Sequence, residues 1–235
     1  MRTYTVGEIK VHQFTWDILD SNTFVIDDNN SALFIDVVDT EELFEFARGF
    51  KDILILLTHA HYDHICGLNR LREVCNDTLV YASECCSNNI QDPRKNLSNI
   101  ADPLMAFHEK KEVVKKRIKP FACKAAERTY TDLAEIEWKN HKIQMSEYHG
   151  HSADSSCIVI DEKFLFSGDT ILPIPTVTRL PGGSTKKFWE EDIPRLMQMC
   201  NKIDMVFPGH KYPGNLAEML AGNKMPLRSN SSKCL

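Results

Sequence analysis

The stretch THAHYDH, residues 58–64, directly follows the apolar run ILILL at residues 53–57. That run has the length and continuity of a strand covered on both faces. In an extended chain residues i and i+2 project to the same side, so His59 and His61 face one point. If a helix then begins, Asp63 and His64 turn toward a second point close by. Imidazole nitrogens and carboxylate oxygens are ligands of zinc, iron and manganese, so the stretch predicts a metal site.

Three further segments carry such a residue where a predicted strand ends. They are His151 after the strand 142–147, Asp169 after the strand 163–166 and His210 after the strand 203–207. A glycine stands directly before each of the three, and glycine allows close approach of the backbone. One cluster cannot complete two coordination spheres, so these strand ends are the expected source of the remaining ligands.

Composition limits the class of protein. The chain has 235 residues, of which 43% are hydrophobic and 26% are charged, so we expect one domain over 1–235 with a substantial core. A net charge of −5 argues against a nucleic-acid or membrane-surface partner and favours a small-molecule substrate. The N-terminus lacks the apolar stretch of a secretory signal, and no apolar run reaches the ~20 residues of a membrane span. We therefore expect a cytoplasmic protein with reduced cysteines; its oligomeric state is left open.

Predicted strands and helices interleave along the chain, which indicates α/β or α+β layers. The strands are expected at 3–13, 23–26, 32–35, 53–57, 79–82, 133–138, 142–147, 157–160, 163–166 and 203–207. The helices are expected at 41–48, 64–75 and 186–200, with a short one near the C-terminus. Thr40 and Gly49 are the expected cap and end of the first helix.

The ordered set of His59, His61, Asp63 and His64, then His151, Asp169 and His210, resembles the metallo-β-lactamase superfamily over about residues 10–215. Asp36 in LFIDVV matches that family's early strand-end aspartate. The stretches DPRKNLS (92–98) and RLPGGS (179–184) look like its hydroxyacylglutathione hydrolase, or glyoxalase II, branch. The resemblance implies an α/β (α+β) four-layer αβ/βα sandwich with metals at one edge between two sheets.

The resemblance also implies a ligand set for two divalent metal ions, with zinc preferred over iron or manganese. His59, His61 and His151 would hold the first metal, Asp63, His64 and His210 the second, and Asp169 would bridge them. A hydroxide shared by the two ions would attack an acyl carbon, while Asp63 orients it and accepts its proton. The expected function is a dinuclear metal hydrolase of a small acyl substrate, with thioester or lactone ahead of β-lactam.

Several features depart from the family pattern. Only 25 residues follow His210, so we expect no C-terminal glutathione-binding domain. His149 stands where relatives often have proline and competes with His151 as a ligand. We favour His151, which follows a glycine, and leave His149 as a substrate-binding candidate or a bystander. Arg179 either reaches a substrate anion or is an ordinary surface arginine.

Segment 84–128 is a predicted helical insertion with a basic amphipathic stretch at 103–119. Its apolar side either packs on the sandwich or caps the metal site, in which case Met105 and Phe107 would contact the acyl group.

Two other functions remain as alternatives. One is a mononuclear iron persulfide dioxygenase-like enzyme, which keeps the first-metal histidines. The other is a non-catalytic, metal-bound binding or regulatory module of the same fold. Oxygen reduction is disfavoured because flavodiiron relatives carry Glu where His61 stands.

Overall fold

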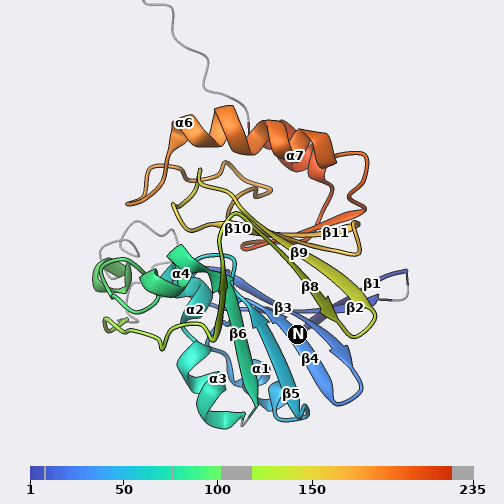
Figure 1. The fold of residues 1–235 in the computed structure, drawn as a ribbon, viewed down its shortest axis with the longest axis vertical. Helices are drawn as coiled ribbons and strands as arrows, with labels where there is room; N and C mark the ends of the chain where they lie inside the picture. Colours follow the sequence, from blue (N-terminus) through green and yellow to red (C-terminus); the bar gives the residue numbers. More distant parts are fainter. Residues whose placement is uncertain (8, 76, 102–117, 224–235) are drawn as a thin grey trace, which may run out of the picture.

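The computed structural model describes residues 1–7, 9–75, 77–101 and 118–223, and contains two stacked β-sheets with helices on the outer face of each (Figure 1). The seven-stranded sheet has the order β1 (Arg2–Val6), β2 (Ile9–Thr15), β3 (Asn22–Asp28), β4 (Ser31–Ile35), β5 (Asp52–Leu56), β6 (Thr78–Ser83) and β7 (Arg128–Tyr130). The five-stranded sheet has the order β12 (Met205–Pro208), β11 (Phe164–Gly168), β10 (Ser156–Ile160), β9 (His141–Glu147) and β8 (Leu133–Trp138).

The helical elements are short. They are α1 (Glu41–Ala47), α2 (Tyr62–Ile65), α3 (Leu68–Val74), α4 (Glu84–Asn89), η1 (Ser98–Ile100), α6 (Thr185–Lys187), the π-helical turn η3 (Phe188–Asp192), α7 (Ile193–Met199) and α8 (Leu216–Gly222). Helix α1 begins as expected, because the Thr40 side chain accepts a hydrogen bond from the Leu43 N–H.

Both sheets repeat one strand plan. In each, four successive strands pair antiparallel, β1 to β4 in one sheet and β8 to β11 in the other. A helical crossover then adds a parallel strand: α1 leads from β4 to β5, and the α6–α7 segment leads from β11 to β12. The first sheet continues in parallel to β6 and β7.

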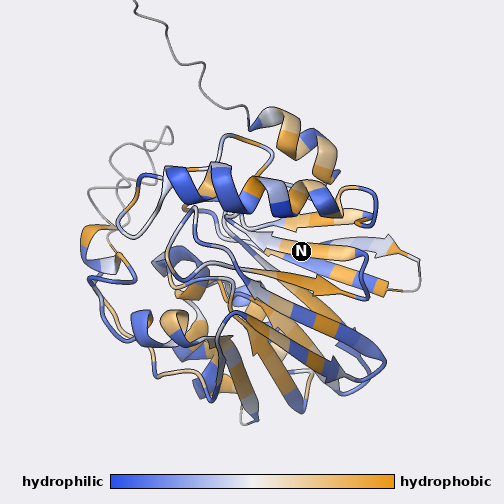
Figure 2. Ribbon diagram, turned by 45° about the horizontal axis from the view of Figure 1, so that its top comes forward, coloured by the Kyte–Doolittle hydropathy of each residue, from blue (hydrophilic) through white to orange (hydrophobic). Residues whose placement is uncertain are grey.

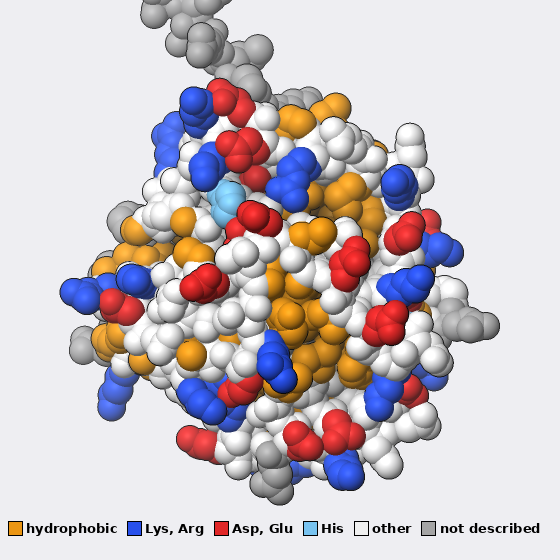
Figure 3. All heavy atoms as spheres, viewed as in Figure 1, with side chains coloured by type: hydrophobic (Ala, Val, Ile, Leu, Met, Phe, Trp, Pro, Cys, Tyr) orange, Lys and Arg blue, Asp and Glu red, His pale blue; other side chains and the backbone are white. Residues whose placement is uncertain are grey.

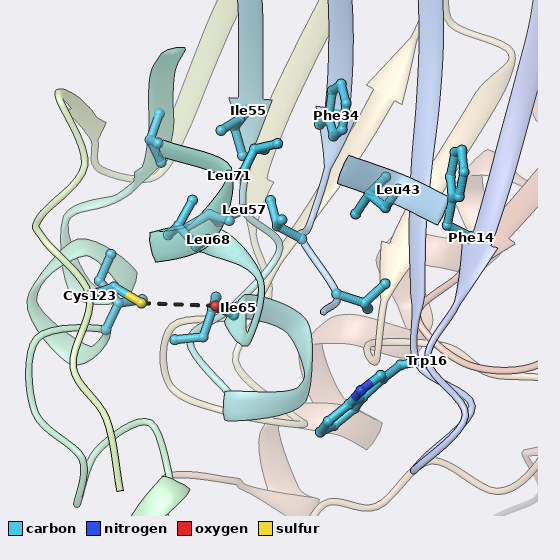
Figure 4. Close-up of a cluster of buried hydrophobic side chains, with 14 of the residues drawn as sticks. Phe14, Trp16, Phe34, Leu43, Ile55, Leu57, Ile65, Leu68, Leu71 and Cys123 are labelled. Atoms are coloured by element: carbon cyan, nitrogen blue, oxygen red, sulfur yellow. Dashed lines mark hydrogen bonds between the residues drawn. The ribbon is translucent and has the colours of Figure 1, made fainter. Parts of the chain in front are cut away.

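Three apolar clusters separate the four layers. Strand β4 shows the alternation, because Phe34 belongs to the cluster shared with α1 and α3, whereas Leu33 belongs to the cluster between the sheets. Figure 4 shows Phe34, Leu43, Leu68 and Leu71 in the first of these clusters. The third cluster lies between the five-stranded sheet and helices α7 and α8. The predicted four-layer αβ/βα sandwich is therefore confirmed.

Four elements differ from the sequence-based expectation. The predicted strand 3–13 is the hairpin β1–β2, which turns at Gly7 with a φ of 62°. The predicted helix 64–75 is divided into α2 and α3 at Gly67, where a Cβ would overlap the Val38 carbonyl. The predicted helix 186–200 is interrupted by η3. Strand β7 was not predicted.

The insertion at 84–128 is described in part. Helix α4 and η1 belong to it and β7 begins at its last residue, whereas residues 102–117, including Met105 and Phe107, lie outside the described residues. Among the described residues, no helix has the length and hydropathy needed to cross a bilayer.

Apolar residues concentrate in the strands, while α6 is hydrophilic and α7 carries both hydrophilic and hydrophobic residues (Figure 2). The sandwich is less well covered on its side between β6 and β8, where apolar side chains are exposed (Figure 3). A hollow on this side is lined in part by Leu54, Leu79, Tyr81, Ile136 and Trp138.

Candidate metal centre

The stretch THAHYDH lies where β5 leaves the seven-stranded sheet. His61 still has extended backbone angles, with φ −59° and ψ 140°, and helix α2 begins at the next residue, Tyr62. His59 and His61 therefore lie before the change of direction, whereas Asp63 and His64 lie after it. This change divides the cluster into the two groups that the residue spacing predicts.

The first group consists of His59, His61 and His151, whose ligand atoms all lie within 4.8 Å of one another. All three side chains are buried, and His151 Nε2 lies 3.0 Å from His61 Nδ1. Burial, and then the neighbouring His151, lower the pKa of His61 to about 4. Burial, and then His64, lower the pKa of His59 well below its usual value. His59 and His61 are therefore neutral near pH 7, as metal ligation requires.

The second group consists of Asp63, His64 and His210, again within 4.8 Å. His210 Nε2 lies 3.3 Å from Asp63 Oδ2. Burial opposes charge on these groups, but their mutual attraction is larger. It lowers the pKa of Asp63 to about 2 and raises that of His210 to about 10. Without a bound cation both groups are therefore charged near pH 7, and a cation bound through His210 would have to displace its proton.

Asp169 lies between the two groups. Its Oδ2 is 3.2 Å from His210 Nε2 and 3.6 Å from His151 Nε2, and its Oδ1 is 3.5 Å from His64 Nε2. Burial alone would raise the pKa of Asp169, but His210 and His64 hold it well below its usual value. An ionised carboxylate thus faces both groups.

Asp36 orients two of the histidines. Its Oδ2 accepts hydrogen bonds from His64 Nδ1 (2.8 Å) and from Thr58 Oγ1 (2.6 Å), and its Oδ1 accepts one from the Thr58 N–H (2.7 Å). Because Thr58 Oγ1 donates to Asp36, it accepts from His59 Nδ1 at 3.0 Å. Asp36, His59 and His64 also form a close group of potential ligands. The hydrogen bonds given above already link these three side chains, directly or through Thr58. Their closeness therefore needs no metal ion between them.

Two backbone carbonyls orient the rings of His151 and His210. His151 Nδ1 donates to the Val177 carbonyl at 2.7 Å, and His210 Nδ1 donates to the Leu19 carbonyl at 3.0 Å. Each bond leaves Nε2 as the atom directed at the cluster. Sequence reasoning missed both partners, because a backbone carbonyl has no residue-type signature.

The loop that carries His151 is held by Asp192 of η3. Asp192 Oδ2 accepts from the Gly150 N–H at 2.7 Å, and Oδ1 accepts from the His149 N–H at 3.3 Å. A side chain at Gly150 would overlap Asp192 and Phe188, so only glycine fits this approach. Asp192 was also missed, since it lies in the charged run WEED with no pattern of its own.

The structure does not bring His149 or Arg179 into the cluster. His149 Nδ1 donates to the Ala153 carbonyl at 2.9 Å, and its Nε2 lies 3.8 Å from Glu147. Arg179 is exposed on the loop that follows Asp169. The substrate-binding roles of both residues stay predictions.

The donor atoms themselves fit a cation. Among the described residues, six buried side-chain polar atoms have no hydrogen-bond partner, and three belong to this cluster: His59 Nε2, His64 Nε2 and Asp169 Oδ1. A buried polar atom without a partner typically costs ~1–3 kcal/mol, so such a concentration requires a reason. Nitrogen and carboxylate donors that converge from two sheets fit zinc, iron or manganese.

Comparison with known families agrees with this geometry. The model of the "Metallo-beta-lactamase superfamily" matches residues 16–210. This range includes the six side chains of the two groups and, as the seventh, Asp169. The chain therefore belongs to the metallo-β-lactamase superfamily, as its residue pattern predicts.

Two curated relatives match over short stretches. A Streptococcus pyogenes serotype M6 protein described as "Probable metallo-hydrolase" is 30% identical over 95 residues, 39% of this chain and 41% of the relative. A hydroxyacylglutathione hydrolase of Francisella philomiragia is 39% identical over 61 residues, 25% of this chain and 24% of the relative. The chain thus spans less than half the length of either relative.

Solved structures share the fold over most of the chain. The BLEG-1 B3 metallo-beta-lactamase has a TM-score of 0.70 at 22% identity, covering 91% of this chain and 97% of that one. A protein crystallised in a di-iron-bound form has a TM-score of 0.67 at 22% identity, covering 90% and 98%. At this level of identity the likeness shows the fold alone.

Proposed function

We propose that this chain is a hydrolase that uses two divalent metal ions to cleave a small acyl substrate, with a thioester or lactone ahead of a β-lactam. The observation that carries the proposal is the pair of buried donor groups with Asp169 between them. In this proposal His59, His61 and His151 would hold the first ion, Asp63, His64 and His210 would hold the second, and Asp169 would lie between the two as a shared ligand.

When bound, such ions act as Lewis acids that lower the pKa of a shared water and polarise an acyl carbonyl. Zinc suits the donor set best, with iron or manganese next, and the di-iron form of one structural neighbour is consistent with this range. The short match to a hydroxyacylglutathione hydrolase supports the glyoxalase II-like branch and therefore a thioester.

The protein's own side chains position the reaction. Asp63, with a pKa near 2, is ionised at neutral pH, so its Oδ2 can accept a hydrogen bond from the attacking water and orient it. Burial of Asp63 and Asp169 keeps bulk water away and strengthens their electrostatic effect. Arg179 lies two residues beyond Val177, whose carbonyl holds His151, and in this proposal binds an anionic part of the substrate.

The test begins with metal content. Protein loaded with zinc, iron or manganese should hold two equivalents by plasma mass spectrometry. It should hydrolyse members of a panel of thioesters and lactones, lose activity on chelation and regain it with metal. Asp169→Asn is the matched variant, because it keeps the side-chain size but removes the bridging charge.

A different result would assign a different function. At most one equivalent after loading would contradict the dinuclear centre. One iron together with persulfide-dependent oxygen uptake would place the chain among the dioxygenase-like enzymes. Two metals without turnover of any acyl substrate would favour a binding module.

A further inference from the structure

Large apolar side chains are exposed at particular places on this molecule. Among the described residues, those with at least 40% exposure are Met1, Leu79, Leu133, Ile174, Val177, Met197 and Tyr212. Three of them, Ile174, Val177 and Tyr212, lie on the two chain segments that leave Asp169 and His210. Single exposed apolar residues are ordinary, but a group of them is a recognition signal. We call these three residues the apolar rim.

Hydrogen bonds place Val177 beside the donor cluster. Its carbonyl accepts from His151 Nδ1 at 2.7 Å, so Val177 borders the first donor group. The loop that carries it is fixed by Asn223, whose Nδ2 donates to the carbonyls of Leu172 (3.0 Å) and Ile174 (3.3 Å). Asn223 Oδ1 also accepts from the Thr176 N–H at 2.7 Å. These hydrogen bonds fix the backbone of the loop in the conformation that leaves Ile174 and Val177 exposed.

A hollow of about 400 Å³ joins the two segments. Its lining includes Pro173 and Ile174, which follow Asp169, and Lys211, Tyr212 and Pro213, which follow His210. The hollow is thus lined by Ile174 and Tyr212, whereas Val177, on the same loop as Ile174, contacts the donor cluster through its carbonyl.

Charge favours an apolar occupant over an anionic one. Lys211 Nζ pairs with Asp20 Oδ2 at 3.1 Å, and the Arg2 guanidinium lies over the Tyr212 ring, 4.4 Å from its centroid. Both cations are therefore engaged. Glu218 lines the same hollow and would repel a carboxylate.

We infer that the apolar rim binds an alkyl or aryl group of the substrate, next to the acyl carbon that reacts. The substrate is then a thioester or lactone with a hydrophobic acyl chain. This inference rests on the proposed function and specifies its substrate class. Each methylene that the rim removes from water should raise kcat/KM by about 3- to 4-fold.

The experiment measures kcat/KM along a series of unbranched acyl thioesters and lactones of increasing chain length. The wild type should show a steady rise with chain length. The double variant Ile174→Ser, Tyr212→Ser changes the two rim residues that line the hollow, and should lose most of that rise but keep its metal and its activity on the shortest substrate. Leu79→Ser is the matched control. Leu79 is 40% exposed, close to the 42% of Ile174, but lies at the start of β6, far from the carboxyl ends that carry the donors. Its chain-length dependence should equal that of the wild type.

A binding measurement separates this inference from the proposed function. If no acyl substrate turns over, the proposed function fails, and calorimetry with fatty acids of increasing length still tests the rim. Binding that strengthens with chain length in the wild type and not in the double variant would support the role of the rim even though the proposed function had failed. The inference is overturned if neither rate nor binding depends on chain length. It is also overturned if Leu79→Ser removes that dependence equally, or if an anionic chain end is preferred to an apolar one.

Discussion

In four of the five imidazoles of the cluster, the direction of the ring is decided by the partner of its Nδ1; the fifth, His61, turns Nδ1 toward His151 Nε2 at 3.0 Å. His59, His64, His151 and His210 bond through Nδ1 to Thr58, Asp36, Val177 and Leu19 respectively. In each case Nε2 is left as the atom that faces the cluster. Such outer partners fix the tautomer and the ring orientation, so little rearrangement is needed when a cation binds.

The assignment of His151 over His149 can be tested residue by residue. His151→Ala should weaken metal binding at the first group by more than about 100-fold, because even outer-shell changes typically cost 10–100-fold. His149→Ala should keep both metals, since its ring contacts Ala153 and Glu147. Metal content by plasma mass spectrometry after dialysis checks both variants, and the reverse pattern would show that the ligand is His149.

At the scale of elements, η3 explains how a helix on one sheet controls a loop at the cluster. π-helical turns are rare and often occur at functional sites. Here the turn ends at Asp192, whose two carboxylate oxygens accept the N–H groups of His149 and Gly150. Ser184, the N-cap of α6, adds a bond from its N–H to the Gly150 carbonyl at 2.8 Å. The loop before His151 is thus fixed through two N–H groups and one carbonyl of its backbone.

Asp192→Asn should loosen this loop, because an amide has only one acceptor oxygen for two N–H donors. We expect metal affinity at the first group to fall by about 10-fold, as for other outer-shell changes, with the overall fold retained. Competition with a chromophoric chelator measures the affinity. Glu191→Gln, at the exposed neighbouring position, is the control and should have no effect.

The same variant should change the pH dependence of stability. Burial raises the pKa of Asp192 to about 6, above its ordinary value, although the Gly150 and His149 N–H groups act in the opposite direction. The folded protein therefore binds this proton more tightly, and the associated stability is lost as pH rises from about 4 to 6. Over that window the free energy of unfolding of the metal-free wild type should fall relative to Asp192→Asn, by at most ~1.4 kcal/mol per pH unit for one proton. Urea unfolding across this range provides the check; parallel curves for the two proteins would contradict it.

The strand ends and the donor residues were predictable because their signals are local. The apolar run before His59 and the glycines before His151, Asp169 and His210 are visible in a few neighbouring letters. The division at Gly67 was not predictable, because the Gly67 N–H donates to the Val37 carbonyl at 2.9 Å, thirty residues away in the chain. The Val177 and Leu19 carbonyls and Asp192 depend on similarly distant contacts. The domain extent, the cytoplasmic location and the cap formed by segment 84–128 stay predictions.

For the whole molecule, the proposed centre draws its donors from both sheets. His59 follows β5 in one sheet, while Asp169 and His210 follow β11 and β12 in the other. Two cations bound here would connect the sheets at an edge where the buried charges of Asp63 and Asp169 otherwise depend on nearby histidines.

Removal of metal should therefore lower the melting temperature. One site at a free metal concentration of 100 Kd stabilises the folded state by about 2.7 kcal/mol, which for a chain of this size is about 5–10 °C in Tm. Calorimetric scans with and without a chelator measure the shift. Asp169→Asn should show a much smaller shift in Tm between the metal-loaded and chelated forms. Equal Tm values for loaded and chelated wild type would contradict the prediction.

The repeated strand plan has a consequence for how the protein matures. The first half of the chain supplies His59, His61, Asp63 and His64, and the second half supplies His151, Asp169 and His210. Neither half contains a full set for either donor group. A newly made chain whose halves have not yet docked would present only part of each coordination sphere. Tight metal binding would therefore be confined to molecules in which the two halves have assembled correctly.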